Sequence, residues 1–217
     1  AGDNERMLLF VLHLTAFCLY DLLHSNHWYG AEQVVIISAS SKTSTGLAYG
    51  LADDDNAPSV IGLTSAKNIN MVNSTHTYDS VLSYEDLEQI DASKPTVIVD
   101  MSANSDVISR LHKHLGDNMR FTSNVGLTHW DEPRQRGDII AERSQQFFAP
   151  SHIQQRMNDW GPAEFSKRSM AYIGRSVAKS RAWLKITEID GIDGLSQVYS
   201  NVCDGNIAAD EGLVVVL

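Results

Sequence analysis

Basic residues are few in this chain of 217 residues, which has 17 Lys and Arg against 27 Asp and Glu and a formal net charge of −10. Proteins that bind nucleic acids or anionic membrane surfaces need a basic face. The charge balance therefore argues against a nucleic acid or a membrane as the main partner.

Cysteine is also scarce. The only two cysteines, Cys18 and Cys203, lie far apart and form no C-x-x-C pair. Such a pair cannot build a disulfide framework or a multi-cysteine zinc site. We therefore expect a reducing, cytoplasmic location and no metal.

The sequence lacks an apolar run of the length that crosses a bilayer. Residues 7–23 (MLLFVLHLTAFCLYDLL) span 17 positions and include His13, Thr15 and Asp21, whereas a membrane span needs about 20 apolar residues. The preceding AGDNER is not the net-basic start of a signal peptide, and no small-residue cleavage site follows. We predict a buried amphipathic helix here.

Short β-branched runs then alternate with helical segments. The predicted strands are residues 34–38, 59–65, 80–83, 96–102 and 120–126, and the predicted helical segments are residues 45–53, 66–75, 84–90 and 106–116. Near-continuous apolar strands separated by helices are typical of βαβ units whose parallel sheet is buried on both faces. Since crossovers between parallel strands are right-handed, we predict an α/β fold with a doubly wound, mostly parallel, Rossmann-type sheet and flanking helices.

The remainder of the chain has a different pattern. Residues 127–137 indicate a polar loop, residues 139–181 a mostly helical segment broken at Trp-Gly-Pro (160–162), and residues 183–190 and 213–217 two late strands. No repeat, low-complexity tract or long linker interrupts the sequence. We predict one nucleotide-binding domain over residues 1–217, made of an opening helix (1–30), a core of βαβ units (31–126), and a loop, helices and closing strands (127–217).

Ligands of doubly wound sheets bind beyond the carboxyl ends of the strands, so the first strand end is the first candidate site. It is followed by small and hydroxyl-bearing residues at the start of a helix, where backbone N–H groups and the helix dipole favour a phosphate. The candidate phosphate ligands are Ser38, Ser40, Ser41, Lys42, Thr43 and Ser44. A Ser/Thr-rich turn with an ordinary N-cap explains the same composition equally well.

Several common catalytic motifs are missing. The turn has no G-x-G-x-x-G pattern, and only Gly46 remains of the glycines that such a turn prefers. The Walker pattern is absent because Lys42 and Thr43 lack both of its glycines, which excludes a P-loop NTPase. Neither a Y-x-x-x-K pair nor a G-x-S-x-G elbow occurs, so short-chain dehydrogenases and serine hydrolases are unsupported.

The second strand end bears on the choice of cofactor. NAD-binding sites usually carry Asp or Glu there for the ribose 2′-hydroxyl, but this sequence has Ser65 and Lys67. A hydroxyl and an ammonium suit a 2′-phosphate, which favours NADP over NAD. The alternative is that Lys67 is an ordinary solvated residue.

The other strand ends supply candidate ribose and nicotinamide contacts. They are Tyr84, Ser102, Asn124, Val125 and Gly126, although Asn124 equally suits backbone hydrogen bonding at a strand end. The catalytic residues are unknown from the sequence. The loop THWDE offers His129 as a speculative proton donor.

The order of these segments resembles a known superfamily. The succession VVIISASSKTSTGLAYGLA, VIGLTSAKN, YDSVLSYEDL and PTVIVDMSANSDV is similar to the cofactor-binding half of the medium-chain dehydrogenase/reductases, with Tyr84 and Asp100 at steps typical of quinone-reductase-like members. LTAFCLYDLL resembles the long helix before their first Rossmann strand, and VYSNVCDGNIAADEGLVVVL their closing helix and strand. SNVGLTHWDE and FFAPSHIQQRMNDWGP resemble a divergent bacterial family classed as a domain of unknown function.

The resemblance implies an NADP-dependent oxidoreductase, or its cofactor-binding domain, that moves hydride to an activated alkene, quinone or carbonyl of a small molecule. Residues 40–44 would hold the pyrophosphate, Ser65 and Lys67 the 2′-phosphate, and residues 124–126 would border the nicotinamide. The GroES-like domain, which holds much of the substrate pocket in that superfamily, has no counterpart in this sequence. We therefore expect that the chain binds cofactor and lacks catalysis by itself.

Two alternatives stay open from the sequence. One is a non-catalytic Rossmann module that senses a nucleotide or serves in assembly, with self-association through the apolar face that the missing domain would leave. The other is an S-adenosylmethionine site on a similar sheet. The second alternative is less favoured, because methyltransferase sheets usually carry an acidic residue at the second strand end.

Overall fold

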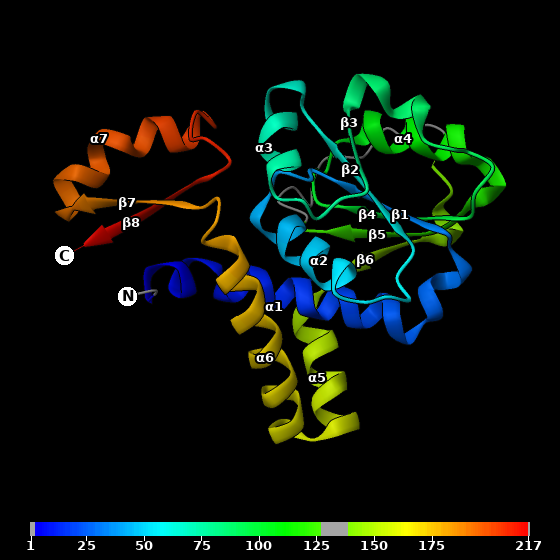
Figure 1. Cartoon of the computed structure of the whole chain (residues 1–217), viewed down its shortest axis with the longest axis horizontal. Coiled ribbons are helices and arrows are strands. Elements are labelled where there is room, and N and C mark those ends of the chain that lie inside the picture. The colour runs from blue at the N-terminus through cyan, green and yellow to red at the C-terminus, as the bar shows by residue number, and fades with distance from the viewer. Residues whose placement is uncertain (1–2, 127–138, 217) are drawn as a thin grey trace.

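The central feature of the computed structural model is a six-stranded parallel sheet with helices on both faces (Figure 1). The model describes residues 3–126 and 139–216. The spatial order of the strands is β3 (Ser80–Ser83), β2 (Ser59–Thr64), β1 (Gln33–Ile37), β4 (Thr96–Asp100), β5 (Met119–Val125) and β6 (Ser144–Phe147). This order reverses between β1 and β4, so the predicted doubly wound Rossmann-type fold is confirmed.

Two helical layers bury the sheet because its strands are apolar on both faces. Val34 and Ile36 of β1 pack on one side with residues of α1 (Asp3–Ser25), α2 (Lys42–Ala52) and α6 (Pro162–Ser180), and α5 (Ala149–Trp160) lies against the same cluster. Val35 and Ile37 pack on the other side against α4 (Ser105–Leu115) and the 3-10 helix η3 (Tyr84–Gln89). Every residue of β1 and β4 is consequently buried.

The helical segments differ in detail from the sequence-based expectation. Residues 66–75 form a short 3-10 turn, η2 (Ala66–Asn68), followed by α3 (Ile69–Ser74), and residues 84–90 form a 3-10 helix. Helix α2 starts at Lys42, three residues before the predicted start at residue 45, because the Ser41 side chain caps it. The predicted break at residues 160–162 is confirmed, since α5 ends at Trp160 and α6 begins at Pro162.

The mostly helical prediction for residues 139–181 is wrong at one place. Strand β6 lies inside that segment and forms the edge of the sheet, paired with β5. Its sequence, Ser-Gln-Gln-Phe, contains no β-branched residue. The strand therefore depends on backbone pairing with β5 rather than on local propensity.

Helix α1 is longer than its apolar run suggested. It has 23 residues and is long and apolar enough to span a membrane by length and composition, although 44% of its most apolar window is buried inside the protein. Its inner polar residues have protein partners, as in the bond between His13 Nδ1 and Ser176 Oγ at 2.7 Å. We interpret α1 as a core helix, in agreement with the predicted buried amphipathic helix.

The carboxyl-terminal part forms a second, smaller sheet (Figure 1). Strands β7 (Lys185–Asp190) and β8 (Glu211–Val216) pair in parallel and are joined by α7 (Gly191–Cys203). Both predicted late strands therefore exist. We call residues 185–216 the C-terminal lobe; whether lobe and core are one domain, as predicted, stays a prediction.

Candidate functional site

The carboxyl ends of the parallel strands meet at one edge of the main sheet, and the candidate site lies there. From β1 the chain continues to β2 and β3 on one side, and β4, β5 and β6 lie on the other. A crevice for ligands forms at such a reversal in doubly wound sheets. The predicted site residues that the structure describes all follow or end these strands.

The turn after β1 replaces glycines with a strained serine. Ser38 has a φ of +65°, a left-handed conformation that non-glycine residues rarely adopt. The turn is held by hydrogen bonds from Ala39 N to Leu63 O (2.9 Å) and from Ser41 N to Ser38 O (2.8 Å). Strain of this kind persists at positions that the surrounding structure fixes, and it often marks functional sites.

The first turn of α2 presents backbone N–H groups to this edge. Ser41 Oγ accepts from Ser44 N at 3.1 Å, and Ser41 O accepts from Thr45 N at 2.9 Å. The N–H groups of Lys42 and Thr43 lie in the first turn, where a helix offers no internal acceptor. The predicted serines Ser41 and Ser44 thus serve as a cap and a buried contact to Met101, while the N–H groups of the two residues between them suit an anion.

Ser40 joins the first two strand ends. Its buried hydroxyl oxygen accepts hydrogen bonds from Thr64 Oγ1 at 3.2 Å and from Asn68 Nδ2 at 3.0 Å. The partly buried Ser65 and the exposed Lys67 lie on the same η2 turn as Asn68. The β2–η2 turn that carries Ser65 and Lys67 is therefore tied to Ser40 through Thr64 and Asn68, while the predicted contacts of Ser65 and Lys67 with a 2′-phosphate stay a prediction.

Two residues of this network were missed in the sequence. Thr64 ends β2 and Asn68 ends η2, and both bond to Ser40. The sequence signal that could have found them is a cluster of short polar side chains directly after an apolar strand. Such side chains often form hydrogen bonds with nearby backbone and hydroxyl groups.

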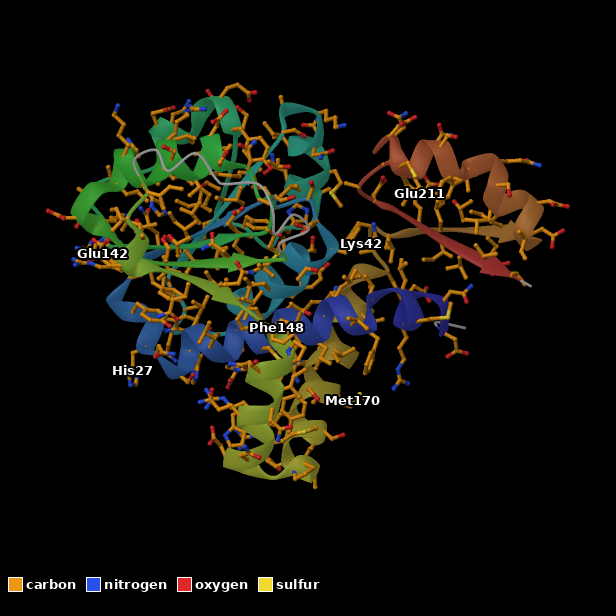
Figure 2. The ribbon with its side chains drawn as sticks, turned by 180° about the vertical axis from the view of Figure 1, so that it is seen from behind. His27, Lys42, Glu142, Phe148, Met170 and Glu211 are labelled. Atoms are coloured by element: carbon orange, nitrogen blue, oxygen red, sulfur yellow. The ribbon has the colours of Figure 1, made fainter. Side chains whose placement is uncertain are left out.

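Lys42 points toward the C-terminal lobe. Its ammonium donates to Ala209 O at 3.2 Å (Figure 2 labels Lys42 and the neighbouring Glu211). Burial lowers the pKa of Lys42, and the nearby carboxylates of Asp210 and Glu211 oppose this change. Lys42 therefore connects the α2 start to the lobe, and its predicted role at a phosphate stays a prediction.

Tyr84 and Ser102 follow the ends of β3 and β4 at the same edge of the sheet. Burial raises the pKa of Tyr84, and hydrogen bonding with Ser38 acts in the opposite direction. Asp100, which is buried, accepts from Ser102 N at 2.8 Å and from Ser102 Oγ at 2.7 Å. These bonds fix the β4 turn and leave the Tyr84 phenol next to the strained Ser38.

The end of β5 offers fewer free groups than predicted. Asn124 Nδ2 donates to Gln145 O of β6 at 3.4 Å, which is the backbone role that the sequence left open. Val125 packs against the core, and Gly126 is exposed with a φ of +66°. His129 lies outside the described residues. Within residues 3–126 and 139–216, no group of three or more His, Cys, Asp or Glu side chains is arranged to hold a metal ion.

Solved structures of nicotinamide-dependent reductases share this fold. A candidate NADPH:quinone reductase from Mesorhizobium loti superposes with a TM-score of 0.65 at 12% identity, over 95% of this chain and 58% of that one. The YhdH oxidoreductase from Salmonella enterica, in complex with NADP, gives 0.63 at 14% identity, over 100% and 65%. YhdH from E. coli with bound NADPH gives 0.62 at 12%, over 98% and 63%.

These similarities establish the fold of the chain and show how much of each solved protein it spans. The chain spans less than two thirds of each of these three proteins. A search of curated proteins gives no match. The model of one protein family, described as "Protein of unknown function (DUF2855)", matches residues 1–208. The chain belongs to this DUF2855 family, and its fold is that of medium-chain dehydrogenase/reductase-like proteins.

Proposed function

We propose that this chain is the cofactor-binding part of an NADP-dependent oxidoreductase of the medium-chain, quinone or enoyl reductase-like type. The observation that carries the proposal is the polar edge at the β1–β4 reversal, where Ser40, just before the α2 start, is bonded to the β2–η2 turn that carries Lys67, and no carboxylate lies at the end of β2. Two of the similar folds were solved with NADP or NADPH bound, which supports the same class of ligand.

The phosphate-binding role rests on the chemistry of the α2 start. The N–H groups of Lys42 and Thr43 and the positive end of the helix dipole would hold the pyrophosphate. The left-handed Ser38 turns the chain in a connection of only four residues between the end of β1 and the start of α2. Gly46 has a different role, because a Cβ atom there would meet the His13 ring at 2.8 Å, so this glycine permits the close packing of α2 on α1.

The preference for NADP rests on Ser65 and Lys67. NADP differs from NAD by a 2′-phosphate, which needs a cation and hydroxyl donors where an NAD site has a carboxylate. Lys67 is exposed at the β2 end and Ser65 lies two residues before it. The bound cofactor would supply the hydride; this chain would bind and orient it at the sheet edge.

The first experiment is calorimetric titration of the chain with NADPH, NADH and AMP. We expect NADPH to bind more tightly than NADH, and Lys67→Glu to weaken NADPH binding by about tenfold or more, since hydrogen bonds to charged groups contribute about 1.5–3 kcal/mol. NADH affinity should change little. The control is Lys94→Glu, the same charge reversal at an exposed residue before β4, on the opposite edge of the sheet.

Each outcome has a distinct meaning. If Lys67→Glu weakens the binding of NADPH and NADH equally, Lys67 does not bind the 2′-phosphate. If the unmodified chain binds neither cofactor, the proposal is rejected. If NADPH binds, its oxidation should be followed with a quinone and with an enone. Binding without turnover would identify a nucleotide-binding module that needs further protein for catalysis.

A further inference from the structure

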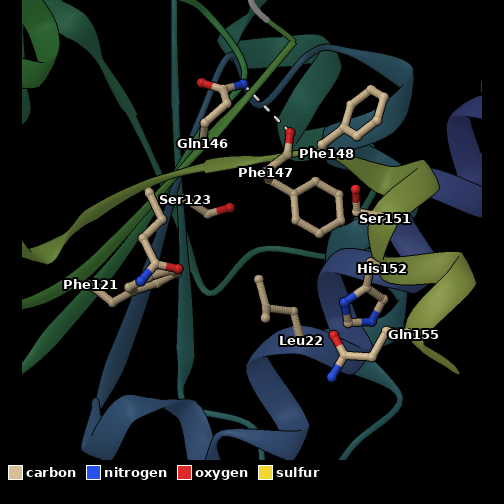
Figure 3. Close-up of a pocket in the computed structure, with 10 residues that line it drawn as sticks. Leu22, Phe121, Ser123, Gln146, Phe147, Phe148, Ser151, His152 and Gln155 are labelled. Atoms are coloured by element: carbon tan, nitrogen blue, oxygen red, sulfur yellow. Dashed lines mark hydrogen bonds between the residues drawn. The ribbon is translucent and has the colours of Figure 1, made fainter. Parts of the chain in front are cut away.

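A pocket lies under the edge strand β6, at a different place from the β1–β4 reversal. It has a volume of about 140 Å³ and is lined by residues of β5, β6, α5 and the end of α1 (Figure 3). Its walls include Phe121 of β5, Phe147 of β6 and Leu22 of α1. These side chains belong to, or pack against, the core cluster on the α1 face of the sheet, so the pocket is a hollow in the edge of the core.

The floor of this pocket contains an unpartnered hydroxyl. Ser123 is 1% exposed, and its Oγ atom has no hydrogen-bond partner among the described residues. In Figure 3 this hydroxyl points from β5 toward the Phe147 ring. A buried polar group without a partner costs free energy that a bound hydrogen-bonding ligand would recover.

The charges beside the pocket are already compensated. His152, which lines the pocket, bonds through Nε2 to Asp21 Oδ2 at 2.7 Å, and Arg156 Nε donates to the same carboxylate oxygen at 2.5 Å. The other polar side chains of the lining are neutral glutamines and serines. Among the described residues, the charged groups beside the pocket are already paired, so a charged ligand would find no free opposite charge. A neutral ligand costs less free energy to remove from water.

Aromatic residues dominate the apolar wall. Phe121 and Phe147 are buried, while Phe148 also lines the pocket and is 63% exposed. A cavity of about 150 Å³ holds a single benzene ring, and aromatic rings pack favourably against one another. A ring in this pocket would cover apolar surface and bring a polar substituent to Ser123.

We propose that this pocket binds a neutral, single-ring aromatic compound that carries a hydroxyl or carbonyl oxygen. The ring packs against Phe121 and Phe147, and the oxygen exchanges a hydrogen bond with Ser123. None of its lining residues is among the predicted cofactor contacts, although Ser123 directly precedes Asn124 in β5.

The test uses fluorine NMR titrations with para-fluorophenol and its near-isostere para-fluorotoluene, which lacks the hydroxyl. We expect para-fluorophenol to bind saturably with a Kd at or below about 10 mM. Ser123→Ala should weaken its binding by about fivefold to tenfold, the equivalent of one hydrogen bond, and leave para-fluorotoluene unchanged. Because Ser123→Ala removes an unpartnered hydroxyl, its midpoint of thermal unfolding should not fall.

A second pair of variants tests the location. Ser151→Trp would fill the pocket from the exposed first turn of α5 and abolish binding of both probes, while Gln154→Trp, at an exposed position of the same helix that does not line the pocket, should leave binding intact. NADPH affinity should stay the same in both variants. The proposal is overturned if para-fluorophenol fails to bind, if it binds Ser123→Ala equally well, or if para-fluorobenzoate binds more tightly.

Discussion

The six-stranded core and the C-terminal lobe are both built from parallel βαβ units, yet they are buried to very different degrees. Every residue of β1 and β4 is buried. In the lobe, α7 has no buried residue, and its Ile192 and Tyr199 are 69% and 62% exposed. The same local pattern of strand, helix and strand thus gives two regions that differ in how much of their surface is buried.

The difference follows from what covers each sheet. Core strands have helices on both faces. The lobe sheet packs α7 on one side and meets the core through a few contacts, such as Gly212 against Leu8 of α1 and Asn4 Nδ2 donating to Glu188 Oε1 at 2.8 Å. A region with little buried apolar surface opens at a lower free-energy cost than the core. In the core, substitutions of buried groups should therefore cause the largest losses in the free energy of unfolding. In the lobe, the substitutions with a measurable effect should be those at its contacts with the core.

The largest expected effect comes from breaking an ion pair in the core. Burial alone would raise the pKa of Asp21, but hydrogen bonds from His152 and Arg156 outweigh it and lower the pKa. Asp21→Ala leaves the buried His152 without its carboxylate and removes the innermost acceptor of Arg156, so we expect a loss of about 3–5 kcal/mol in the free energy of unfolding. Chemical denaturation of the variant and the unmodified chain measures this difference in free energy.

Two matched variants sharpen this result. Asp159→Ala removes the more exposed partner of the same Arg156 and should cost at most about 0.5 kcal/mol. Asp210→Ala breaks the lobe ion pair with Lys185, whose side chain is 76% exposed, and should not shift the denaturation midpoint measurably. Equal losses for Asp21→Ala and Asp210→Ala would contradict the contrast between core and lobe.

An intermediate effect on the free energy of unfolding is expected from a change in pH, through the core residue His112. His112 Nδ1 accepts from Ile140 N at 2.9 Å, so its neutral ring carries the proton on Nε2, which donates to Thr122 Oγ1 at 2.9 Å. Burial lowers the pKa of His112 to about 4, from 6.5. Protonation of Nδ1 would break the bond from Ile140.

The sign of the pH effect follows from this lowered pKa. Between pH 6.5 and 4 the unfolded chain binds more protons than the folded chain at His112. Stability is therefore fully present above pH 6.5 and decreases on acidification, by about 1 kcal/mol per pH unit for this residue. His112→Gln should flatten that slope in denaturation curves recorded from pH 7 to pH 4; an unchanged slope would mean that other groups, such as His13, dominate.

The core could be predicted from the sequence more fully than the site. Runs such as VVIIS and TVIVD specify buried parallel strands by composition alone. Strand β6 could not be predicted, because its Ser-Gln-Gln-Phe sequence depends on pairing with β5. The start of α2 was predicted three residues too late, because the sequence does not show which serine of the Ser/Thr-rich turn is the N-cap.

For the candidate site, the sequence indicated which strand ends share one edge of the sheet but not the contacts made there. Parallel strand ends meet at one edge, which made Ser40 and Lys67, after β1 and β2, both candidates, and their role at a cofactor stays a prediction. The bond from Asn68 to Ser40 and the turn of Lys42 toward Ala209 depend on tertiary packing across 28 and 167 positions of sequence. The unpartnered Ser123 is likewise invisible in the sequence, because burial on the α1 face follows only from the complete fold.

The smallest expected effect lies at the boundary between the two regions. Lys42→Met keeps the length of the side chain but removes the bond to Ala209 O and the attraction to Asp210 and Glu211. We expect amide hydrogen exchange in residues 205–216 to rise about twofold to tenfold, the equivalent of one hydrogen bond, because the lobe detaches more often. Exchange in residues 96–100 of the core should not change, since these amides report global unfolding.

Lys67→Met is the matched control, because Lys67 is an exposed lysine at the same sheet edge. It should leave exchange in the lobe unaltered. If Lys42→Met accelerates exchange equally in residues 96–100 and 205–216, then core and lobe unfold as one unit and the contrast between them fails. If only the lobe responds, Lys42 holds the lobe against the α2 start, and the lobe opens independently of the core.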